Sequence, residues 1–249
     1  MTDRAFAVTG AASGIGAAVV AVLRSRGDSV IAMDLAHPDS ATSAAPGSEG
    51  GGIHLVACDV TDPSAVAAGL DAGIAAFEGA FDGLIHCAGI YLKSPTEDQD
   101  LDMWRRVLRI NLEGSFIAAS AAGRRLIDAG RPGSIVLVSS TAAFLGDFTE
   151  PSAGYSASKG GVVSLGRQLA VEWGRRGIRT NVVVPGVIDT KMTTIVNHPE
   201  AFEKVLEAIP LGRLGTADEV AQVCAFLASE HAGFVNGAVV PVDGGQLIN

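Results

Sequence analysis

The chain has 249 residues, a size that fits one α/β domain, and 48% of them are hydrophobic against 18% charged. Its net charge is −9 and its arginines are scattered, which argues against a nucleic-acid partner. No apolar run approaches the roughly 18 residues of a membrane span, and Met1–Arg4 shows no signal-peptide pattern. Cys58, Cys87 and Cys224 form no C-x-x-C pair, so we expect a cytoplasmic protein without a disulfide framework or a metal site.

The N-terminal pattern predicts a strand, a glycine turn and a helix. Residues 5–9 are an apolar run typical of a buried strand, and apolar residues recur at helical spacing from Ile15 to Leu23. The turn between them is Gly10-Ala-Ala-Ser-Gly-Ile-Gly16. Without Cβ atoms, such a turn lets backbone N–H groups and a helix start approach a pyrophosphate. It lacks the Gly-Lys-Ser/Thr of a P-loop, so a dinucleotide is favoured, and a purely structural turn is the alternative.

The second predicted strand, residues 29–33, ends at Asp34. This acid follows the glycine turn at close to the offset of about 20 residues at which a carboxylate hydrogen-bonds the adenosine ribose. A carboxylate there repels a 2′-phosphate by roughly 1–4 kcal/mol, depending on the local dielectric. No Lys or Arg stands in the turn or directly after Asp34 to offset this repulsion. NAD is therefore favoured over NADP, and a solvated strand-end acid is the alternative.

The rest of the chain continues to alternate strands and helices. Further strands are predicted over 53–58, 84–87, 134–138, 178–184 and 237–242. Helices are predicted from Pro63, as two separate helices over 101–108 and 116–130, through Tyr155, and over 216–229, and residues 36–52 are predicted to be a loop. This alternation predicts a Rossmann-type, doubly wound parallel sheet of about seven strands in a three-layer αβα fold.

Chemistry-bearing residues gather at the predicted strand ends, where doubly wound sheets bind ligands. They are Gly10, Asp34, Asp59, Gly89, Ser140 and Pro185. Tyr155 and Lys159 lie four residues apart, hence on one face of a helix. An ammonium beside a phenol favours the phenolate, and moving the phenol pKa from about 10 to about 7 needs roughly 4 kcal/mol. The pair therefore indicates a tyrosine acid/base tuned by lysine, unless the two are chance neighbours on an amphipathic helix.

Taken together, the motifs resemble the short-chain dehydrogenase/reductase family, in its short single-domain branch, over nearly the whole length. The resemblance rests on Thr9-Gly10-x-x-x-Gly14-Ile15-Gly16, Asp59-Val60, Asn111, the Ser140 region, Tyr155-x-x-x-Lys159, Pro185-Gly186 and Asp243-Gly244-Gly245. It implies one dehydrogenase domain over residues 1–249, with a substrate loop at about 187–212. It also implies a homotetramer.

The resemblance implies a catalytic tetrad of Asn111, Ser140, Tyr155 and Lys159. Tyr155 would exchange the hydroxyl proton, and Lys159 would lower its pKa and hydrogen-bond the nicotinamide ribose. Ser140 would stabilise the substrate oxygen, and Asn111 would hold a water in the proton relay. The implied cofactor-binding residues are Gly10, Ser13, Gly14, Ile15, Gly16, Asp34, Asp59, Val60, Ala88, Gly89, Tyr155, Lys159, Pro185, Gly186, Val187 and Thr190.

The chain departs from the family pattern in two places. His86-Cys87 stands where the family usually has Asn-Asn, and we expect His86 to be a satisfied strand-end histidine rather than a catalytic group. The segment between the serine pair and Tyr155 is about two residues longer than usual. This leaves Ser139 and Ser140 open as the catalytic serine, with the strand end favouring Ser140.

The substrate side is predicted less sharply. Phe144, Phe148, Glu150 and Met192 are expected to border the pocket. Glu150 or Asp147 is a candidate to accept hydrogen bonds from a second hydroxyl of a diol or polyol, with a solvated loop acid as the alternative. Residues 187–211 form an amphipathic segment that either closes over the substrate or packs against the body or a partner subunit.

The sequence favours an NAD-dependent dehydrogenase that interconverts a secondary alcohol or polyol with a ketone. One alternative is an NADPH-dependent 3-oxoacyl (acyl-carrier) reductase, for which Arg124-Arg125 and Arg175-Arg176 suit a docking face while Asp34 opposes NADPH. The other is a catalytically silent nucleotide-binding scaffold, against which the complete tetrad argues. The expected partner is a small alcohol or ketone, with neither nucleic acid nor membrane.

Overall fold

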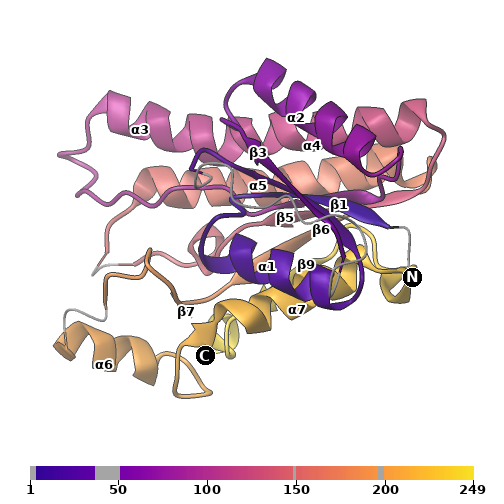
Figure 1. The fold of residues 1–249 in the computed structure, drawn as a ribbon. Helices are drawn as coiled ribbons and strands as arrows, with labels where there is room; N and C mark the ends of the chain where they lie inside the picture. Colours follow the sequence, from indigo (N-terminus) through magenta and orange to yellow (C-terminus); the bar gives the residue numbers. More distant parts are fainter. Residues whose placement is uncertain (1–3, 37–50, 148–149, 196–198) are drawn as a thin grey trace.

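A parallel sheet organises the residues described by the computed structural model, which are 4–36, 51–147, 150–195 and 199–249 (Figure 1). Its strand order is β3-β2-β1-β4-β5-β6-β9. The strands are β1 (Ala5–Thr9), β2 (Ser29–Asp34), β3 (Ile53–Ala57), β4 (Gly83–His86), β5 (Gly133–Val138), β6 (Ile178–Pro185) and β9 (Val239–Val242). The predicted sheet is confirmed, and no strand begins or ends more than two residues from its predicted position.

Helices cover both faces of the sheet, which confirms the three layers (Figure 1). One face carries α1 (Gly14–Ser25) and α7 (Ala217–Ala228), which pack against each other. The opposite face carries α2 (Pro63–Ala76), α3 (Leu101–Leu108), α4 (Gly114–Asp128) and α5 (Ala153–Gly174). None of the helices in the described ranges combines the length and apolar character that a membrane crossing requires.

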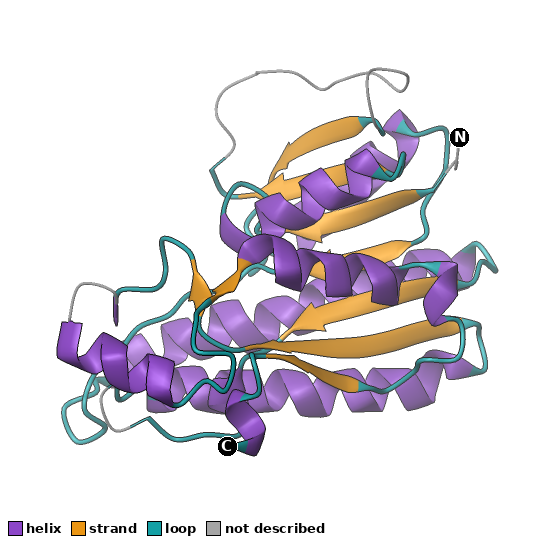
Figure 2. Ribbon diagram, turned by 90° about the horizontal axis from the view of Figure 1, so that it is seen from below, coloured by secondary structure: helices purple, strands orange, loops and turns teal. Residues whose placement is uncertain are grey.

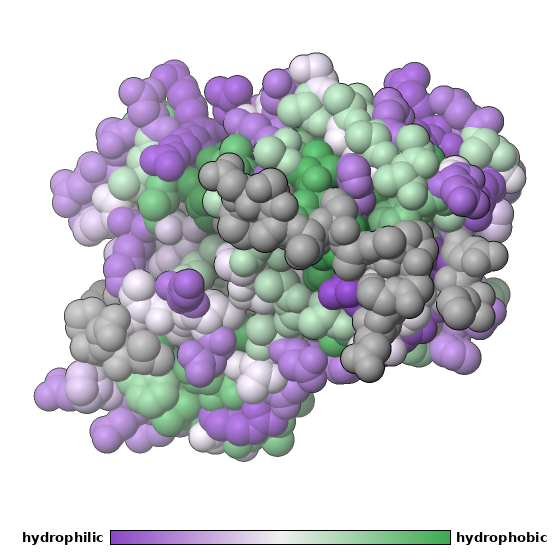
Figure 3. Space-filling model, viewed as in Figure 1, coloured by the Kyte–Doolittle hydropathy of each residue, from purple (hydrophilic) through white to green (hydrophobic). Residues whose placement is uncertain are grey.

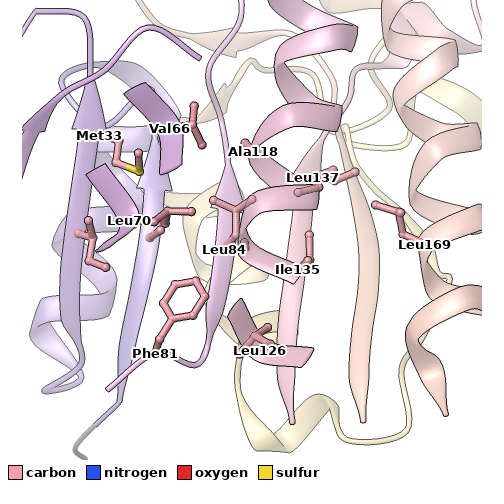
Figure 4. Close-up of a cluster of buried hydrophobic side chains, with 14 of the residues drawn as sticks. Met33, Val66, Leu70, Phe81, Leu84, Ala118, Leu126, Ile135, Leu137 and Leu169 are labelled. Atoms are coloured by element: carbon pink, nitrogen blue, oxygen red, sulfur yellow. The ribbon is translucent and has the colours of Figure 1, made fainter. Parts of the chain in front are cut away.

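Two hydrophobic cores form because successive side chains of a strand point to opposite faces. In β5, Ile135 and Leu137 belong to the core beneath α2, α4 and α5, which Figure 4 shows in close-up. Val136 and Val138 belong to the core beneath α1 and α7. Burying such a side chain contributes roughly 1.5–3 kcal/mol, so near-continuous apolar strands suit a sheet covered on both sides.

The two helices predicted over 101–108 and 116–130 are joined, contrary to the expected break. A π-helical turn, Arg109–Glu113, connects α3 to α4, and the residues that flank it, Leu108 and Gly114, keep helical backbone angles. No proline stands between Leu101 and Asp128 to stop the helix. Such π-turns insert an extra residue into a helix and often occur at functional sites. Here the turn carries Asn111, which is fully buried.

A second, two-stranded sheet, not predicted from the sequence, anchors the expected substrate segment. β7 (Ile188–Asp189) pairs in parallel with β8 (Gly215–Thr216). Between them, α6 (Pro199–Glu207) projects beyond the sheet on the side to which the strand arrowheads point (Figure 2). Apolar surface lies around the C-terminal end of α6 (Figure 3), and Leu211 is 67% exposed. The segment is thus fixed at both ends while part of its apolar surface stays open.

Some predictions fall outside the described residues. The loop expected over 36–52 lies there except at its ends, and so do Phe148 and Val196.

Candidate active site

The strand order places the switch point of the fold between β1 and β4, where doubly wound sheets bind their ligands. Gly10 follows β1 with a φ of +67°, and a Cβ there would lie 2.8 Å from the backbone nitrogen of Ala88. A Cβ on Gly16 would lie 2.0 Å from the carbonyl oxygen of Gly10. Because only glycine fits these positions, the turn can bring the start of α1 against the carboxyl ends of β1 and β4.

Asp34, at the end of β2, lies beside this turn. One carboxylate oxygen accepts a hydrogen bond from the Ala12 N–H at 3.0 Å, and the other accepts one from the Ala36 N–H at 3.1 Å. Ser13, the N-cap residue of α1, makes no side-chain capping hydrogen bond. The backbone N–H groups at the start of α1 therefore need solvent or a ligand as hydrogen-bond acceptor. Glycines that admit close approach, an uncapped helix start and a fixed carboxylate fit the pyrophosphate and ribose of a dinucleotide.

A cavity of about 1200 Å³ runs past these groups along the ends of the strands. This volume exceeds the range of roughly 300–1,000 Å³ typical of ligand pockets, so it suits a dinucleotide together with a small substrate. Every residue predicted for cofactor binding lines it: Gly10, Ser13, Gly14, Ile15, Gly16, Asp34, Asp59, Val60, Ala88, Gly89, Tyr155, Lys159, Pro185, Gly186, Val187 and Thr190.

Helix α5 brings Lys159 to the ring of Tyr155, as the four-residue spacing predicts. The Lys159 ammonium nitrogen lies 5.7 Å from the centroid of that ring and donates a hydrogen bond to the Val138 carbonyl at 3.0 Å. Lys159 is only 5% exposed. Burial disfavours the charged form and lowers the pKa of Lys159 to about 8.

The pKa of Tyr155 depends here on burial and on Ser140. Burial raises it above its ordinary value, and a hydrogen bond with the Ser140 side chain lowers it only in part. Lys159 is not among the groups that shift the pKa of Tyr155 here, so its role in holding the phenol near neutrality stays a prediction. In this arrangement the ammonium lies over the ring and donates to the Val138 carbonyl. Tyr155 thus keeps its proton at neutral pH.

The two serines after β5 have different surroundings. Ser139 is buried, and its hydroxyl donates to the backbone carbonyl of Lys159 at 2.8 Å. Ser140 hydrogen-bonds Tyr155, and its hydroxyl oxygen accepts a hydrogen bond from the Ala142 N–H at 3.2 Å. The geometry therefore places Ser140 beside the phenol, while Ser139 supports the backbone of α5.

His86 is buried at the end of β4, with 1% of its surface exposed. Its Nδ1 lies 2.8 Å from the Thr9 hydroxyl, but its Nε2 has no hydrogen-bond partner among the described residues. The expected satisfied histidine is thus only half satisfied. Burial, assisted by the charge of Lys159, lowers the pKa of His86 to about 3, so the ring is neutral at physiological pH.

Asn111 lies behind the cavity wall rather than on it. Its Oδ1 accepts a hydrogen bond from the Ile90 N–H at 2.8 Å, and its Nδ2 donates to the Ile90 carbonyl at 2.9 Å and to the Ser158 hydroxyl at 3.1 Å. A Cβ on Gly89 would lie 3.2 Å from that Oδ1. Asn111 therefore fixes the turn after β4, and its role in a water relay stays a prediction.

Two of the predicted substrate residues, Glu150 and Met192, line the cavity. Phe144, which follows the short helical turn Thr141–Ala143, does not line it, contrary to expectation, and is 50% exposed. Sequence reasoning missed Tyr91, whose ring meets the Tyr155 ring edge-on with centroids 5.0 Å apart. The available signal was its position two residues beyond the turn that follows β4, because loops at strand ends often carry functional residues.

Comparison with known proteins agrees with this geometry. Residues 10–246 match the family described as enoyl-(acyl carrier protein) reductase. D-threitol dehydrogenase of Mycolicibacterium smegmatis is 39% identical over 97% of this chain and 92% of its own length. Human (3R)-3-hydroxyacyl-CoA dehydrogenase is also 39% identical, over 96% of this chain and 93% of its own.

A solved structure with bound NADP, of a putative 2-deoxy-D-gluconate 3-dehydrogenase from Agrobacterium tumefaciens, superposes with a TM-score of 0.86. It is 31% identical, and the match covers 99% of this chain and 97% of that one. The glycine turn, the tyrosine–lysine helix and these relatives lead to one conclusion. This chain belongs to the short-chain dehydrogenase/reductase family.

Proposed function

We propose that this protein is an NAD-dependent dehydrogenase that interconverts secondary alcohols, including diols and polyols, with the corresponding ketones. The observation that carries the proposal is the shared cavity. Tyr155, with its Ser140 hydrogen bond, lines the same space as the glycine turn and Asp34. A proton carrier and a dinucleotide cradle in one cavity suit coupled transfer of a proton and a hydride. The kinship with an enzyme named D-threitol dehydrogenase supports a hydroxylated substrate.

In the proposed mechanism the glycine turn and Asp34 would hold the dinucleotide, which would supply the hydride chemistry. Burial raises the pKa of Tyr155, so its hydroxyl carries a proton that it can donate to a ketone oxygen. In the reverse direction Tyr155 would first release this proton to solvent, and the phenolate would then take the proton of the alcohol. Ser140, next to the phenol, would donate a hydrogen bond to the same substrate oxygen. Lys159 and Asn111 would hold the ribose and the turn after β4, respectively.

The preference for NAD rests on Asp34. Its carboxylate is fixed by two backbone N–H groups beside the glycine turn, where a 2′-phosphate would meet its negative charge. Repulsion between two such charges at about 4 Å costs roughly 1–4 kcal/mol. The NADP in the solved relative is a property of that protein.

A reductase or dehydrogenase of acyl thioesters is the second candidate. It is favoured by the relative named (3R)-3-hydroxyacyl-CoA dehydrogenase, whose identity to this chain equals that of the threitol enzyme. Overall sequence identity therefore does not distinguish a polyol substrate from an acyl thioester. That distinction depends on the residues on the substrate side of the cavity.

The test is a screen of the purified protein against secondary alcohols, polyols and 3-hydroxyacyl thioesters with NAD⁺ and with NADP⁺. We expect formation of NADH with alcohols or polyols, and weaker activity with NADP⁺. Turnover confined to acyl thioesters, or confined to NADP⁺, would contradict the proposal.

A further inference from the structure

Beside Tyr155, a chain of polar side chains forms part of the cavity wall. The Tyr91 hydroxyl donates a hydrogen bond to Glu150 Oε2 at 3.1 Å, and the Lys93 ammonium pairs with Oε1 at 2.6 Å. The Ser152 side chain also hydrogen-bonds Tyr91. Glu150 is held from both sides by these partners, and its side chain is only 16% exposed. The carboxylate is therefore fixed rather than a freely solvated loop acid.

The Tyr91 ring connects this wall to Tyr155, the proposed proton carrier. The rings of Tyr91 and Tyr155 meet edge-on, with an interplanar angle of 85°. Tyr91, Glu150 and Ser152 line the same cavity as Tyr155, whereas Lys93 approaches the carboxylate from outside the lining. The Tyr91 ring thus borders the space beside the Tyr155 ring, and Glu150 continues the same wall beyond the Tyr91 hydroxyl.

The hydrogen-bonding capacity of the wall selects what can bind there. A carboxylate is an acceptor only, with about four lone-pair positions, and Tyr91 and Lys93 use two of those of Glu150. Burial and the charge of Glu150 raise the pKa of Tyr91, so its hydroxyl keeps the proton that it donates to Glu150. The remaining capacity of Glu150 is for donors. A hydroxyl can donate to it, whereas a ligand carboxylate or phosphate without a proton has no donor to offer.

We propose that Glu150, oriented by Tyr91, binds a second hydroxyl next to the reacting alcohol, and that this wall makes the enzyme selective for neutral vicinal diols and polyols. The inference rests on the proposed dehydrogenase function and names its substrate class. It assigns to Tyr91 a positioning role: the ring packs on Tyr155 while its hydroxyl directs the Glu150 carboxylate. A hydrogen bond to a charged group is worth about 10- to 100-fold in an equilibrium or rate ratio.

The test compares butane-2,3-diol with butan-2-ol, which share a carbon skeleton, under NAD⁺ at saturating concentration. We measure the ratio of kcat/KM for the diol to kcat/KM for the mono-alcohol in the wild type and three variants. Glu150→Gln removes the charge, and Tyr91→Phe keeps the ring but removes the hydroxyl. Glu97→Gln, on the exposed loop that precedes α3 and away from the cavity lining, is the matched control.

We expect the wild type to prefer the diol by at least about tenfold, and both cavity variants to lower that ratio by roughly 10-fold or more. Glu97→Gln should leave the ratio unchanged. A wild type without diol preference, or a ratio that stays within about twofold in both cavity variants, overturns the inference. Tight NAD⁺ binding and unchanged melting temperatures show that the variants are folded. If the wild type oxidises no alcohol at all, the dehydrogenase function itself fails, an outcome distinct from loss of selectivity alone.

Discussion

The half of the cavity proposed for the cofactor and the half proposed for the substrate, called here the cofactor half and the substrate half, differ in what fixes their shape. Around Gly10, Gly16 and Asp34, the geometry is fixed by backbone atoms, because a Cβ on either glycine would collide with main chain. Tyr91 and Glu150 lie on loops, and a hydrogen bond between their side chains fixes the geometry there. The segment that also borders this half is anchored by the β7–β8 pair. Backbone constraints tolerate little change, so substitutions in the cofactor half should impair binding more than substitutions in the substrate half.

The largest expected effect on cofactor binding tests the backbone constraint at Gly16. Gly16→Ala places a Cβ 2.0 Å from the Gly10 carbonyl oxygen, so the glycine turn must shift. We expect dinucleotide affinity to fall by roughly 100-fold or more, equivalent to about 2.7 kcal/mol, as measured by isothermal titration. Gly160→Ala is the control, because its added Cβ meets only an oxygen at 4.0 Å and alanine favours a helix interior. Equal affinities in the two variants would show that the turn is not constrained.

His86 is buried at the end of β4, and its burial predicts a pH-dependent stability. Its pKa is about 3 in the folded protein against 6.5 for an ordinary histidine, so below pH 6.5 the unfolded chain binds more protons. The contribution of neutral His86 to the free energy of unfolding should therefore be fully present above pH 6.5 and should decline as the pH falls toward 3. The loss attributable to this residue is roughly 2 kcal/mol at pH 5.

His86→Asn should remove that share of the acid sensitivity, as measured by urea unfolding at pH 7 and pH 5. The variant has no titrating ring, so the difference between the two pH values should shrink by about the same roughly 2 kcal/mol. An unchanged difference would mean that His86 is not the group responsible.

A smaller effect is expected at Asp34, where the carboxylate opposes a 2′-phosphate. Asp34→Ala should narrow the preference for NAD over NADP by about tenfold, in line with roughly 1–4 kcal/mol of repulsion. The ratio of kcat/KM values for the two cofactors measures it. A wild-type preference for NADP would refute this use of Asp34.

The smallest effect separates the two serines. Ser139→Ala removes one buried hydrogen bond to the Lys159 carbonyl and should cost about 1 kcal/mol of stability, with most of the turnover retained. Ser140→Ala removes the partner of Tyr155 and should lower kcat while leaving the melting temperature close to that of the wild type. The reverse pattern would assign catalysis to Ser139.

The same contrast explains what the sequence could predict. Buried strands leave continuous apolar runs, and glycine turns leave a spacing, so the sheet and the glycine turn follow from local patterns. The spacing of Tyr155 and Lys159 gave their contact but not the pKa of the phenol, which depends on burial and on where the ammonium points. The joined α3 and α4 were missed because a π-turn has no residue signature comparable to proline or glycine.

The substrate half leaves weaker local signals. Tyr91 and Glu150 are far apart in sequence and meet only through the fold, so neither spacing nor composition marks the pair. Phe144 was expected at the pocket from its position between Ser140 and Tyr155, but position on a loop does not fix the direction of a side chain. The β7–β8 pair is too short to produce an alternating pattern.

Whether Tyr155 carries the proton is best tested by comparing Tyr155→Phe with the wild type in alcohol-dependent formation of NADH, alongside NAD⁺ affinity. The variant keeps the ring that packs on Tyr91 and loses only the hydroxyl. We expect kcat to fall by roughly 100- to 10,000-fold, the range typical of a general acid–base group, with NAD⁺ affinity within about threefold of wild type. Turnover at the wild-type rate in Tyr155→Phe would contradict the proposed mechanism.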